Sequence, residues 1–97
     1  MSAPQFDPVI HAPNRLQICA FLAPLQSAEF QVLRNELNVS DSVLSKHIKL
    51  LENTAYVLLS KSKVNGRQRT WVHLTDAGRE AFRNHVEALK RLAYLSD

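Results

Sequence analysis

Residues 40–54, SDSVLSKHIKLLENT, decide the fold, because they predict a helix with two distinct faces. At 100° per residue, Ile48 and Leu51 lie within about 40° of Leu44 and form an apolar face with it. The opposite face carries short hydrogen-bonding side chains and cations, namely Ser42, Ser45, Lys46, Lys49 and Asn53. Side chains of these types contact base edges and phosphates in a DNA major groove. An ordinary solvated face is the alternative, but such a face usually mixes both charge signs.

A second helix is predicted just before this one. Ser27 is its predicted N-cap, and Glu29 falls in its first turn. Its apolar positions follow the spacing i, i+3, i+7 and are Phe30, Leu33 and Leu37. Asn38 tolerates the left-handed conformation that ends a helix, and Ser40 can cap the helix that follows. Helix, tight turn and helix together predict a helix-turn-helix.

Beyond residue 56 the apolar period changes from that of a helix to that of a strand. Two predicted strands, within residues 57–74, are joined through Asn65-Gly66, a typical type I′ hairpin turn. This turn pairs Val64 with Arg67, Leu59 with Val72, and Val57 with Leu74. The last two pairs then place apolar side chains on one face, which supports the register. A wider loop over residues 67–69 is the alternative.

The tip of this hairpin carries four cations and no acid. The cations are Lys61, Lys63, Arg67 and Arg69, and they surround Asn65 and Gly66. Such a cluster repels itself unless an anion lies against it. We therefore expect the hairpin to contact the DNA backbone or the minor groove through these six residues.

The net charge of +3 on the 97-residue chain is concentrated in its middle. Residues 1–41 carry −2, residues 42–75 carry +5, and residues 76–97 are neutral. A positive middle predicts a polyanion-binding surface, and a solvated basic face without a partner is the alternative. The composition, 45% hydrophobic and 22% charged, is that of an ordinary globular domain. The longest apolar run, residues 18–23, is too short to span a membrane, so we expect no membrane partner.

Residues 1–12 hold three of the four prolines and are predicted to form an irregular arm. Residues 13–97 are predicted to form a single domain. It begins with a helix between Pro13 and Pro24 and ends with a helix over residues 76–95, capped by Thr75. We expect no secretory signal, and one cysteine cannot form an internal disulfide, which fits the reducing cytoplasm.

The first and last helices have more apolar surface than so small a core needs. We expect this surplus to form the interface of a homodimer, made of Ile18, Phe21, Leu25, Val86, Leu89, Leu92 and Leu95. A twofold pair would present its two recognition helices to half-sites about 34–36 Å apart, or multiples of this. The alternative is that these residues only complete the core of a monomer.

No catalytic or metal-binding motif is found in the sequence. Cys19 lies in the apolar stripe of the first helix and is interpreted as a buried thiol rather than a redox sensor. The four histidines are scattered, without a second Cys or His at metal-ligand spacing. We therefore expect no metal, no cofactor and no enzymatic activity.

In this order, the elements resemble the small winged helix-turn-helix transcriptional regulators of the MarR and ArsR types. The stretches that carry the resemblance are FQVLRNELNVSD (30–41), LSKHIKLLE (44–52), YV (56–57) and RTWVHLTDAGR (69–79). Asn38 and Ala55 stand where the family usually has glycine. The resemblance implies an α+β fold, mainly α with a small β-hairpin, and an extended C-terminal dimerisation helix.

Taken together, the sequence predicts a sequence-specific regulator that binds double-stranded DNA as a homodimer. The recognition helix, about 41–54, would lie in the major groove, with Ser40, Ser42, Ser45, Lys46 and Lys49 at the DNA. A winged-helix protein-interaction module that does not read DNA is the alternative. The basic face and the basic hairpin favour the regulator. Its operator, its direction of regulation and any small-molecule effector are not encoded in these motifs.

Overall fold

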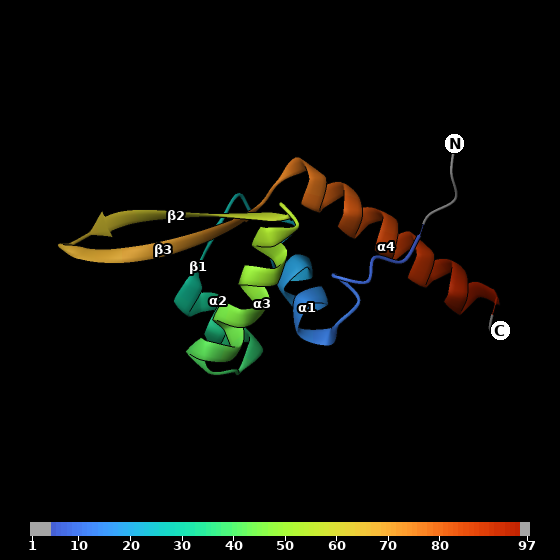
Figure 1. Cartoon of the computed structure of the whole chain (residues 1–97), viewed down its shortest axis with the longest axis horizontal. Coiled ribbons are helices and arrows are strands. Elements are labelled where there is room, and N and C mark those ends of the chain that lie inside the picture. Colours follow the sequence, from blue (N-terminus) through green and yellow to red (C-terminus); the bar gives the residue numbers. More distant parts are fainter. Residues whose placement is uncertain (1–4, 96–97) are drawn as a thin grey trace.

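The structure, a computed structural model, describes the backbone of residues 5–95 and the side chains of residues 5–94 (Figure 1). The elements along the chain are α1 (Pro13–Leu22), β1 (Ala28–Glu29), α2 (Phe30–Leu37), α3 (Asp41–Asn53), β2 (Val57–Val64), β3 (Arg67–Leu74) and α4 (Asp76–Leu95). The strands form one antiparallel sheet in the order β1-β3-β2. The fold is therefore mainly α with a small hairpin, and the predicted winged helix-turn-helix is confirmed.

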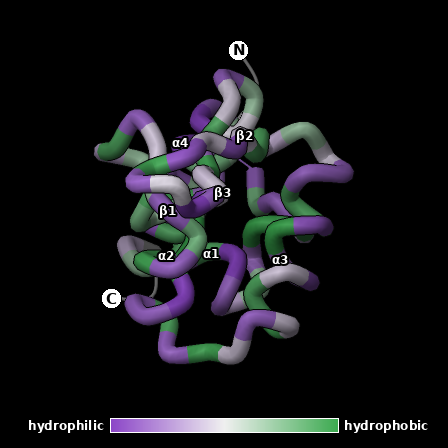
Figure 2. Tube along the Cα trace, turned by 90° about the vertical axis from the view of Figure 1, so that its left-hand side faces the viewer, coloured by the Kyte–Doolittle hydropathy of each residue, from purple (hydrophilic) through white to green (hydrophobic). Residues whose placement is uncertain are grey.

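The core lies where α1, α2 and α3 meet the base of the sheet. One fully buried side chain from each helix, Leu22, Leu33 and Leu44, packs there with Val57 and Val72 of the sheet. Hydrophobic segments gather in the same place, between α1 and α3, in Figure 2. Each such side chain stabilises the fold by about 1.5–3 kcal/mol. The predicted inner face of the recognition helix is confirmed, because Leu44, Ile48 and Leu51 are all buried.

The turn between α2 and α3 has the predicted geometry. Asn38 ends α2 in the left-handed conformation, with φ 54° and ψ 50°. The Ser40 hydroxyl then accepts a hydrogen bond from the Val43 amide at 3.2 Å and caps α3. These two residues set the angle at which α3 leaves the turn.

The hairpin of β2 and β3 forms the wing, and its predicted register is confirmed. Val64 pairs with Arg67, Leu59 with Val72, and Val57 with Leu74. Asn65 and Gly66 both have positive φ, 52° and 78°, as a type I′ turn requires. The alternative of a wider loop is wrong, because Arg67 already belongs to β3. The wing projects from the helices toward one end of the molecule (Figure 1).

The short strand β1 is not predicted from the sequence, and the predicted N-cap of α2 at Ser27 is wrong. Instead, Ala28 pairs with Val72 and Glu29 pairs with Trp71, and α2 begins only after Glu29. Pairing with β3 satisfies backbone groups that a helix would otherwise have used. Glu29 is therefore a strand residue beside the wing and does not lie in a first helical turn.

Residues 5–12 of the N-terminal arm are irregular, as predicted, but they pack closely against the helices. The Asp7 carboxylate accepts hydrogen bonds from the amides of Val9 (2.8 Å) and Ile10 (3.1 Å). Ile10 is fully buried and joins the core. The predicted boundary at residue 13 therefore separates helix from loop but does not mark the edge of the packed core.

Helix α4 starts with the predicted cap, since the Thr75 hydroxyl accepts a hydrogen bond from the Gly78 amide at 3.0 Å. It then runs away from the body of the protein on the side opposite the wing (Figure 1). The resulting shape is elongated, about 52 × 27 × 22 Å. Within residues 5–95, no helix combines the length and the apolar character needed to cross a membrane.

Candidate nucleic-acid interface

The exposed face of α3 carries the side chains that the sequence predicted for DNA contact. Ser42, Ser45, Lys46 and Lys49 are all exposed. The Ser40 hydroxyl is partly engaged, because it caps the helix and lies 3.2 Å from the Ser42 hydroxyl. The two short serine side chains leave room for close approach, and the two lysines can reach bases or phosphates.

The other side of α3 is tied to α1 through His47. The Arg15 guanidinium lies 3.2 Å from His47 Nδ1, and the side-chain amide of Asn14 lies 3.3 Å from His47 Nε2. Since arginine is only a donor, Nδ1 accepts and the ring is neutral, so Nε2 carries the proton and can donate only to the oxygen of the Asn14 amide. Burial lowers the pKa of His47, and the charges of Arg15 and Lys46 lower it further. This contact, which the sequence did not reveal, helps to hold the recognition helix at its angle.

The two faces of the wing carry different cations. Directly paired residues lie on the same face, so Lys61 and Lys63 share a face with Gln68, Thr70 and the buried Val57. Leu59 and Thr70 of this face line a cleft together with α3, so this face is turned toward the recognition helix. Arg67 and Arg69 lie on the opposite face, beside Trp71.

Arg69 differs from the other three wing cations. Its guanidinium forms an ion pair with Glu29 of β1 at 2.6 Å, and the Glu29 side chain is only 16% exposed. Arg69 Nε is buried and has no hydrogen-bond partner among the described residues. The charge of Arg69 is thus largely balanced within the protein, which makes it a tie between β1 and β3. The sequence predicts Glu29 in a helix, so the ion pair with Arg69 is not evident from the sequence alone.

The cleft between α3 and the wing has a volume of about 330 Å³. Its apolar lining is Phe30, Ile48 and Leu59, and its polar lining is Ser45, Lys49, Glu52 and Thr70. Lys61 and Lys63 lie farther along the same face of the wing. One surface therefore joins the exposed face of α3 to the inner face of the wing. Glu52 is the acidic residue of this cleft, and neither it nor Thr70 was singled out from the sequence.

The residues predicted for a dimer interface differ in how exposed they are in the single chain. Ile18 is fully buried in the core of the single chain, so it has no surface to offer a second copy. Phe21, Val86 and Leu89 are half-buried, whereas Leu25 and Leu92 are 38% and 54% exposed. The side chain of Leu95 lies outside what the structure describes. Tyr94, which was not predicted, is 84% exposed near the end of α4.

Cys19 is fully buried, as interpreted from the sequence. Burial, and next the nearby Asp7 carboxylate, raise the pKa of its thiol to about 12, so the thiolate does not form near neutral pH. Among residues 5–95, no group of three His, Cys, Asp or Glu side chains is arranged to hold a metal ion.

An exposed basic helix after a tight turn, followed by a basic hairpin, defines the class of winged helix nucleic-acid-binding domains. Residues 14–93 match the family described as the winged helix DNA-binding domain. The chain is 37% identical over 85 residues to the uncharacterized protein MJ0432 of Methanocaldococcus jannaschii, covering 88% of this chain and 92% of that one. The chain therefore belongs to the winged helix DNA-binding domain family, which is a family of DNA-binding domains and not of enzymes.

Solved structures have the same fold. A transcriptional regulator homologue from Pyrococcus horikoshii OT3 superposes with a TM-score of 0.86 at 31% identity, over 92% of this chain and 88% of that one. The heme sensor protein PefR from Streptococcus agalactiae superposes with a TM-score of 0.74 at 23% identity, over 88% and 59% of the two chains. The resemblance to small winged helix-turn-helix regulators, first drawn from the sequence, is confirmed for the fold and the family.

Proposed function

We propose that this protein is a transcriptional regulator that binds double-stranded DNA sequence-specifically as a homodimer. One observation carries the proposal: the exposed face of α3 presents Ser42, Ser45, Lys46 and Lys49, and the inner face of the wing continues it with further lysines. The similarity to a transcriptional regulator homologue supports the regulatory part of the proposal.

In the proposed complex, α3 lies in the major groove. Ser42 and Ser45 allow the helix to approach the bases, and Lys46 and Lys49 contact bases or the flanking phosphates. Ser40, at the start of the helix, contacts the backbone with the hydroxyl that also caps α3. The DNA strand that leaves the groove runs over the cleft between α3 and the wing.

The wing contacts the backbone or the adjacent minor groove and strengthens binding more than it specifies sequence. Lys61 and Lys63 face the same side as α3, so they contact the strand over the cleft. Asn65, Gly66 and Arg67 form the tip, which reaches farthest along the DNA. Arg69 contributes less, because Glu29 already balances its charge.

The homodimer uses the apolar surface that a single chain leaves partly exposed. This surface comprises Phe21 and Leu25 at the end of α1 and Val86, Leu89 and Leu92 on α4, and we add the exposed Tyr94. Ile18 is left out because it is fully buried. A twofold arrangement would place two copies of α3 on one side of the DNA, about one helical turn or a multiple of it apart.

The regulator would act in the cytoplasm. A single buried cysteine is typical of proteins in this reducing compartment.

Selection of bound fragments from genomic DNA tests this function. The wild-type protein should enrich an inverted repeat whose half-sites are about 10–10.5 base pairs, or a multiple, between centres. The double variant Lys46→Ala, Lys49→Ala should enrich no sequence. If the wild type enriches no sequence and also fails to bind arbitrary duplex DNA, the protein is instead an interaction module that does not read DNA.

A further inference from the structure

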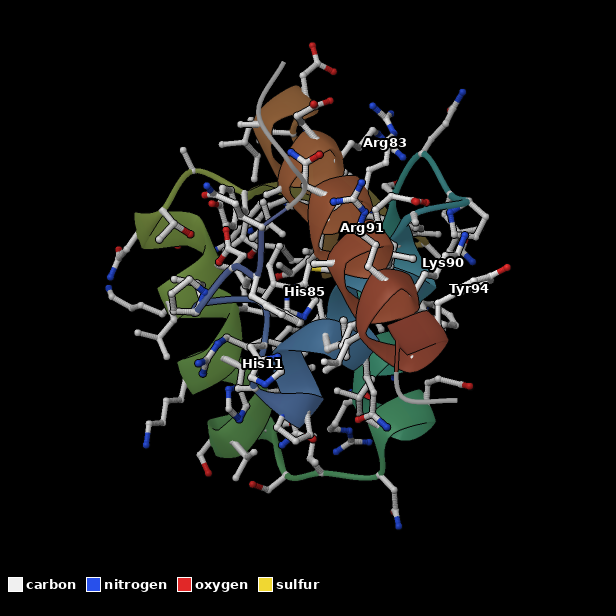
Figure 3. All side chains as sticks on the ribbon, turned by 90° about the vertical axis from the view of Figure 1, so that its right-hand side faces the viewer. His11, Arg83, His85, Lys90, Arg91 and Tyr94 are labelled. Atoms are coloured by element: carbon white, nitrogen blue, oxygen red, sulfur yellow. The ribbon has the colours of Figure 1, made fainter. Side chains whose placement is uncertain are left out.

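The N-terminal arm is attached to the middle of α4 through two histidines. The Asp7 amide lies 3.0 Å from Nδ1 of His85, and Nε2 of His85 lies 3.3 Å from Nδ1 of His11. His85 is fully buried under the arm (Figure 3). The Phe6 ring meets both imidazoles edge to face, at centroid distances of 5.7 Å from His11 and 5.5 Å from His85. We call Phe6, Asp7, His11 and His85 the arm clasp.

Hydrogen bonding fixes the protonation of both rings in the clasp. A backbone amide can only donate, so Nδ1 of His85 accepts from Asp7 and carries no proton. The neutral ring of His85 therefore has its proton on Nε2 and donates it to Nδ1 of His11. The clasp is complete only when His85 is neutral and Nδ1 of His11 is unprotonated.

A shared metal ion is the competing explanation for two imidazole nitrogens 3.3 Å apart. A metal on Nε2 of His85 would need a lone pair there, so the proton would move to Nδ1. That proton would then point at the Asp7 amide, which is also a donor. Within residues 5–95, no third His, Cys, Asp or Glu side chain completes a metal site. The direct hydrogen bond between the rings is therefore the arrangement that fits.

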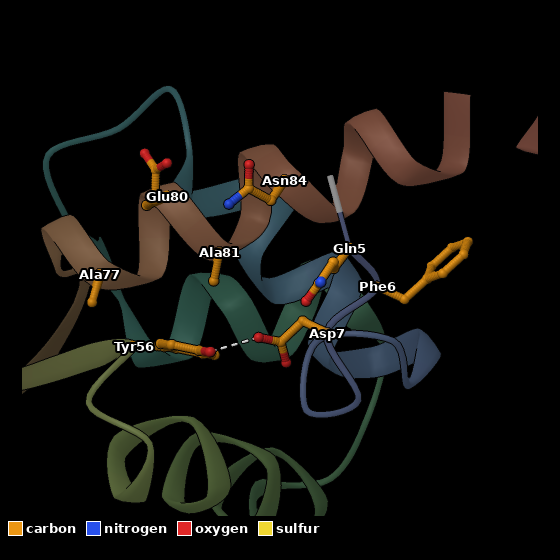
Figure 4. Close-up of a pocket in the computed structure, with 8 residues that line it drawn as sticks. All are labelled: Gln5, Phe6, Asp7, Tyr56, Ala77, Glu80, Ala81 and Asn84. Carbon is orange, nitrogen blue, oxygen red and sulfur yellow. Dashed lines mark hydrogen bonds between the residues drawn. The ribbon is translucent and has the colours of Figure 1, made fainter. Parts of the chain in front are cut away.

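The same arm also reaches the base of the wing. The second oxygen of the Asp7 carboxylate accepts a hydrogen bond from the Tyr56 hydroxyl at 2.5 Å, beside a cavity of about 430 Å³ (Figure 4). The Tyr56 amide donates to Leu51 of α3, and its carbonyl accepts from Thr75 at the start of α4. The arm thus connects α4 with the junction of the recognition helix and the wing.

We propose that the arm is a proton-sensitive clasp, closed while His85 is neutral and released when the ring of His85 takes up a second proton. A proton on Nδ1 of His85 faces the Asp7 amide, which is also a donor. The hydrogen bond between them is then replaced by two opposed donors. Release frees Asp7 and Ile10, and with them the support of Tyr56 at the base of the wing.

The surrounding groups set the direction of this response. Burial of His85, followed by the nearby His11, lowers the pKa of His85, while the Asp7 carboxylate opposes them. Tyr56 and Cys19 have their pKa values raised to about 12, so both stay neutral near physiological pH. From α1, Arg15 holds the Val9 carbonyl of the arm and adds a positive charge nearby. His85 therefore binds fewer protons in the folded chain than in the unfolded chain as the pH falls below about 6.5, and the clasp weakens with acid.

Amide hydrogen exchange, followed by NMR on the full chain without DNA, tests the clasp directly. The Asp7 amide is the reporter, since it donates to His85. Its protection factor should fall by about tenfold or more between about pH 7.5 and pH 5.5, after correction for the intrinsic rate, while amides in the middle of α1 keep theirs. In His85→Gln, whose amide oxygen can accept without titrating, the protection of Asp7 should not depend on pH. His73→Ala, which removes a histidine of β3, should behave as the wild type.

Equal protection of Asp7 at both pH values in the wild type would overturn the proposal, as would an equal acid loss in His85→Gln. If His85→Gln does not fold, the imidazole nitrogen shifts of the wild type decide. Near neutral pH they should show His85 with a proton on Nε2 and none on Nδ1, and the reverse would overturn the proposal. Because no DNA is used, this result is independent of the proposed DNA-binding function.

Discussion

At the scale of single residues, Ala55 holds a backbone conformation that is strained for any side chain with a Cβ atom. Its φ is 63°, in the left-handed region, between α3 and the wing. The small winged helix-turn-helix regulators that the sequence resembles usually have glycine at this position. Ala55 accepts the strain because the chain must turn here so that Tyr56 can bond back to Leu51.

Ala55→Gly should therefore stabilise the protein by about 0.5–1 kcal/mol. Relief of the left-handed strain exceeds the entropy that glycine adds to the unfolded chain. Chemical denaturation gives the free energy of unfolding. The matched control is Ala77→Gly, at an exposed position of α4, which should instead cost about 1 kcal/mol. Destabilisation in both variants would contradict the assigned strain.

Replacing Gly78 by alanine should destabilise the protein, whereas the same change at an ordinary helical glycine usually stabilises it. A Cβ at this position would lie 2.1 Å from the Tyr56 carbonyl oxygen, so α4 or the wing would have to move. Gly78→Ala should lower the free energy of unfolding by about 1–3 kcal/mol, although alanine is the better helix former. A thermal melt compares the variant with the wild type. A higher melting temperature would show that the close packing of α4 on Tyr56 is wrong.

At the scale of elements, local signals in the sequence were enough for the helix-turn-helix and the wing. Asn38, Ser40 and the pair Asn65-Gly66 each determine a turn by their own backbone preference, so the turn and the hairpin register could be predicted. Strand β1 could not be predicted. A strand of two residues is too short to show an alternation of apolar and polar side chains, and it forms only by pairing with β3, which is distant in the sequence.

The candidate site was predictable to the same degree. The exposed face of α3 follows from helical spacing alone. The ion pair of Arg69 with Glu29, the contact of Arg15 with His47 and the burial of His85 all join residues far apart in the chain. In the sequence, the four cations of the wing are equivalent. Only the structure shows that Arg69 differs from the others, because it is paired with Glu29.

This difference predicts unequal roles for the wing cations. The double variant Lys61→Ala, Lys63→Ala should weaken binding to specific and random duplexes alike and flatten the salt slope by about two units for each bound subunit. Arg67→Ala should flatten it by about one unit for each bound subunit. Arg69→Ala should change the slope less and should lower the melting temperature, because it leaves Glu29 half-buried without its partner. Fluorescence anisotropy over a salt series measures the slopes. A flattening for Arg69→Ala as large as that for the double variant would contradict this assignment.

At the scale of the whole molecule, the wing and α4 extend in opposite directions from the helices (Figure 1). The proposed dimer surface on α4 is therefore distant from the proposed DNA surface on the wing, and both can be occupied together. Tyr94 points away from the body near the end of α4 (Figure 3). In the proposed dimer, the second copy would cover α4 while both wings stay accessible to DNA.

Light scattering tests the proposed dimer. The wild type should have about twice the 11.0 kDa mass of the chain at micromolar concentration. Leu92→Glu places a charge on the proposed interface and should shift the mass toward that of one chain. Gln68→Glu adds the same charge at an exposed position of the wing, away from the proposed interface, and should leave the dimer intact. A wild type that is already monomeric would defeat the dimer, whatever the variants do.

The central claim is that the basic face of α3 binds DNA, and the salt dependence of duplex binding tests it most directly. For the wild type, the logarithm of the binding constant should fall linearly with the logarithm of salt concentration, by about 0.9 for each phosphate neutralised. Lys46→Ala with Lys49→Ala should lower this slope by about two units for each bound subunit, and each lysine that reads a base should cost about 1–3 kcal/mol. Arg83→Ala with Arg91→Ala, on α4, also removes two positive charges; this matched control should change neither quantity. An unchanged slope and affinity in the double lysine variant would contradict the claim.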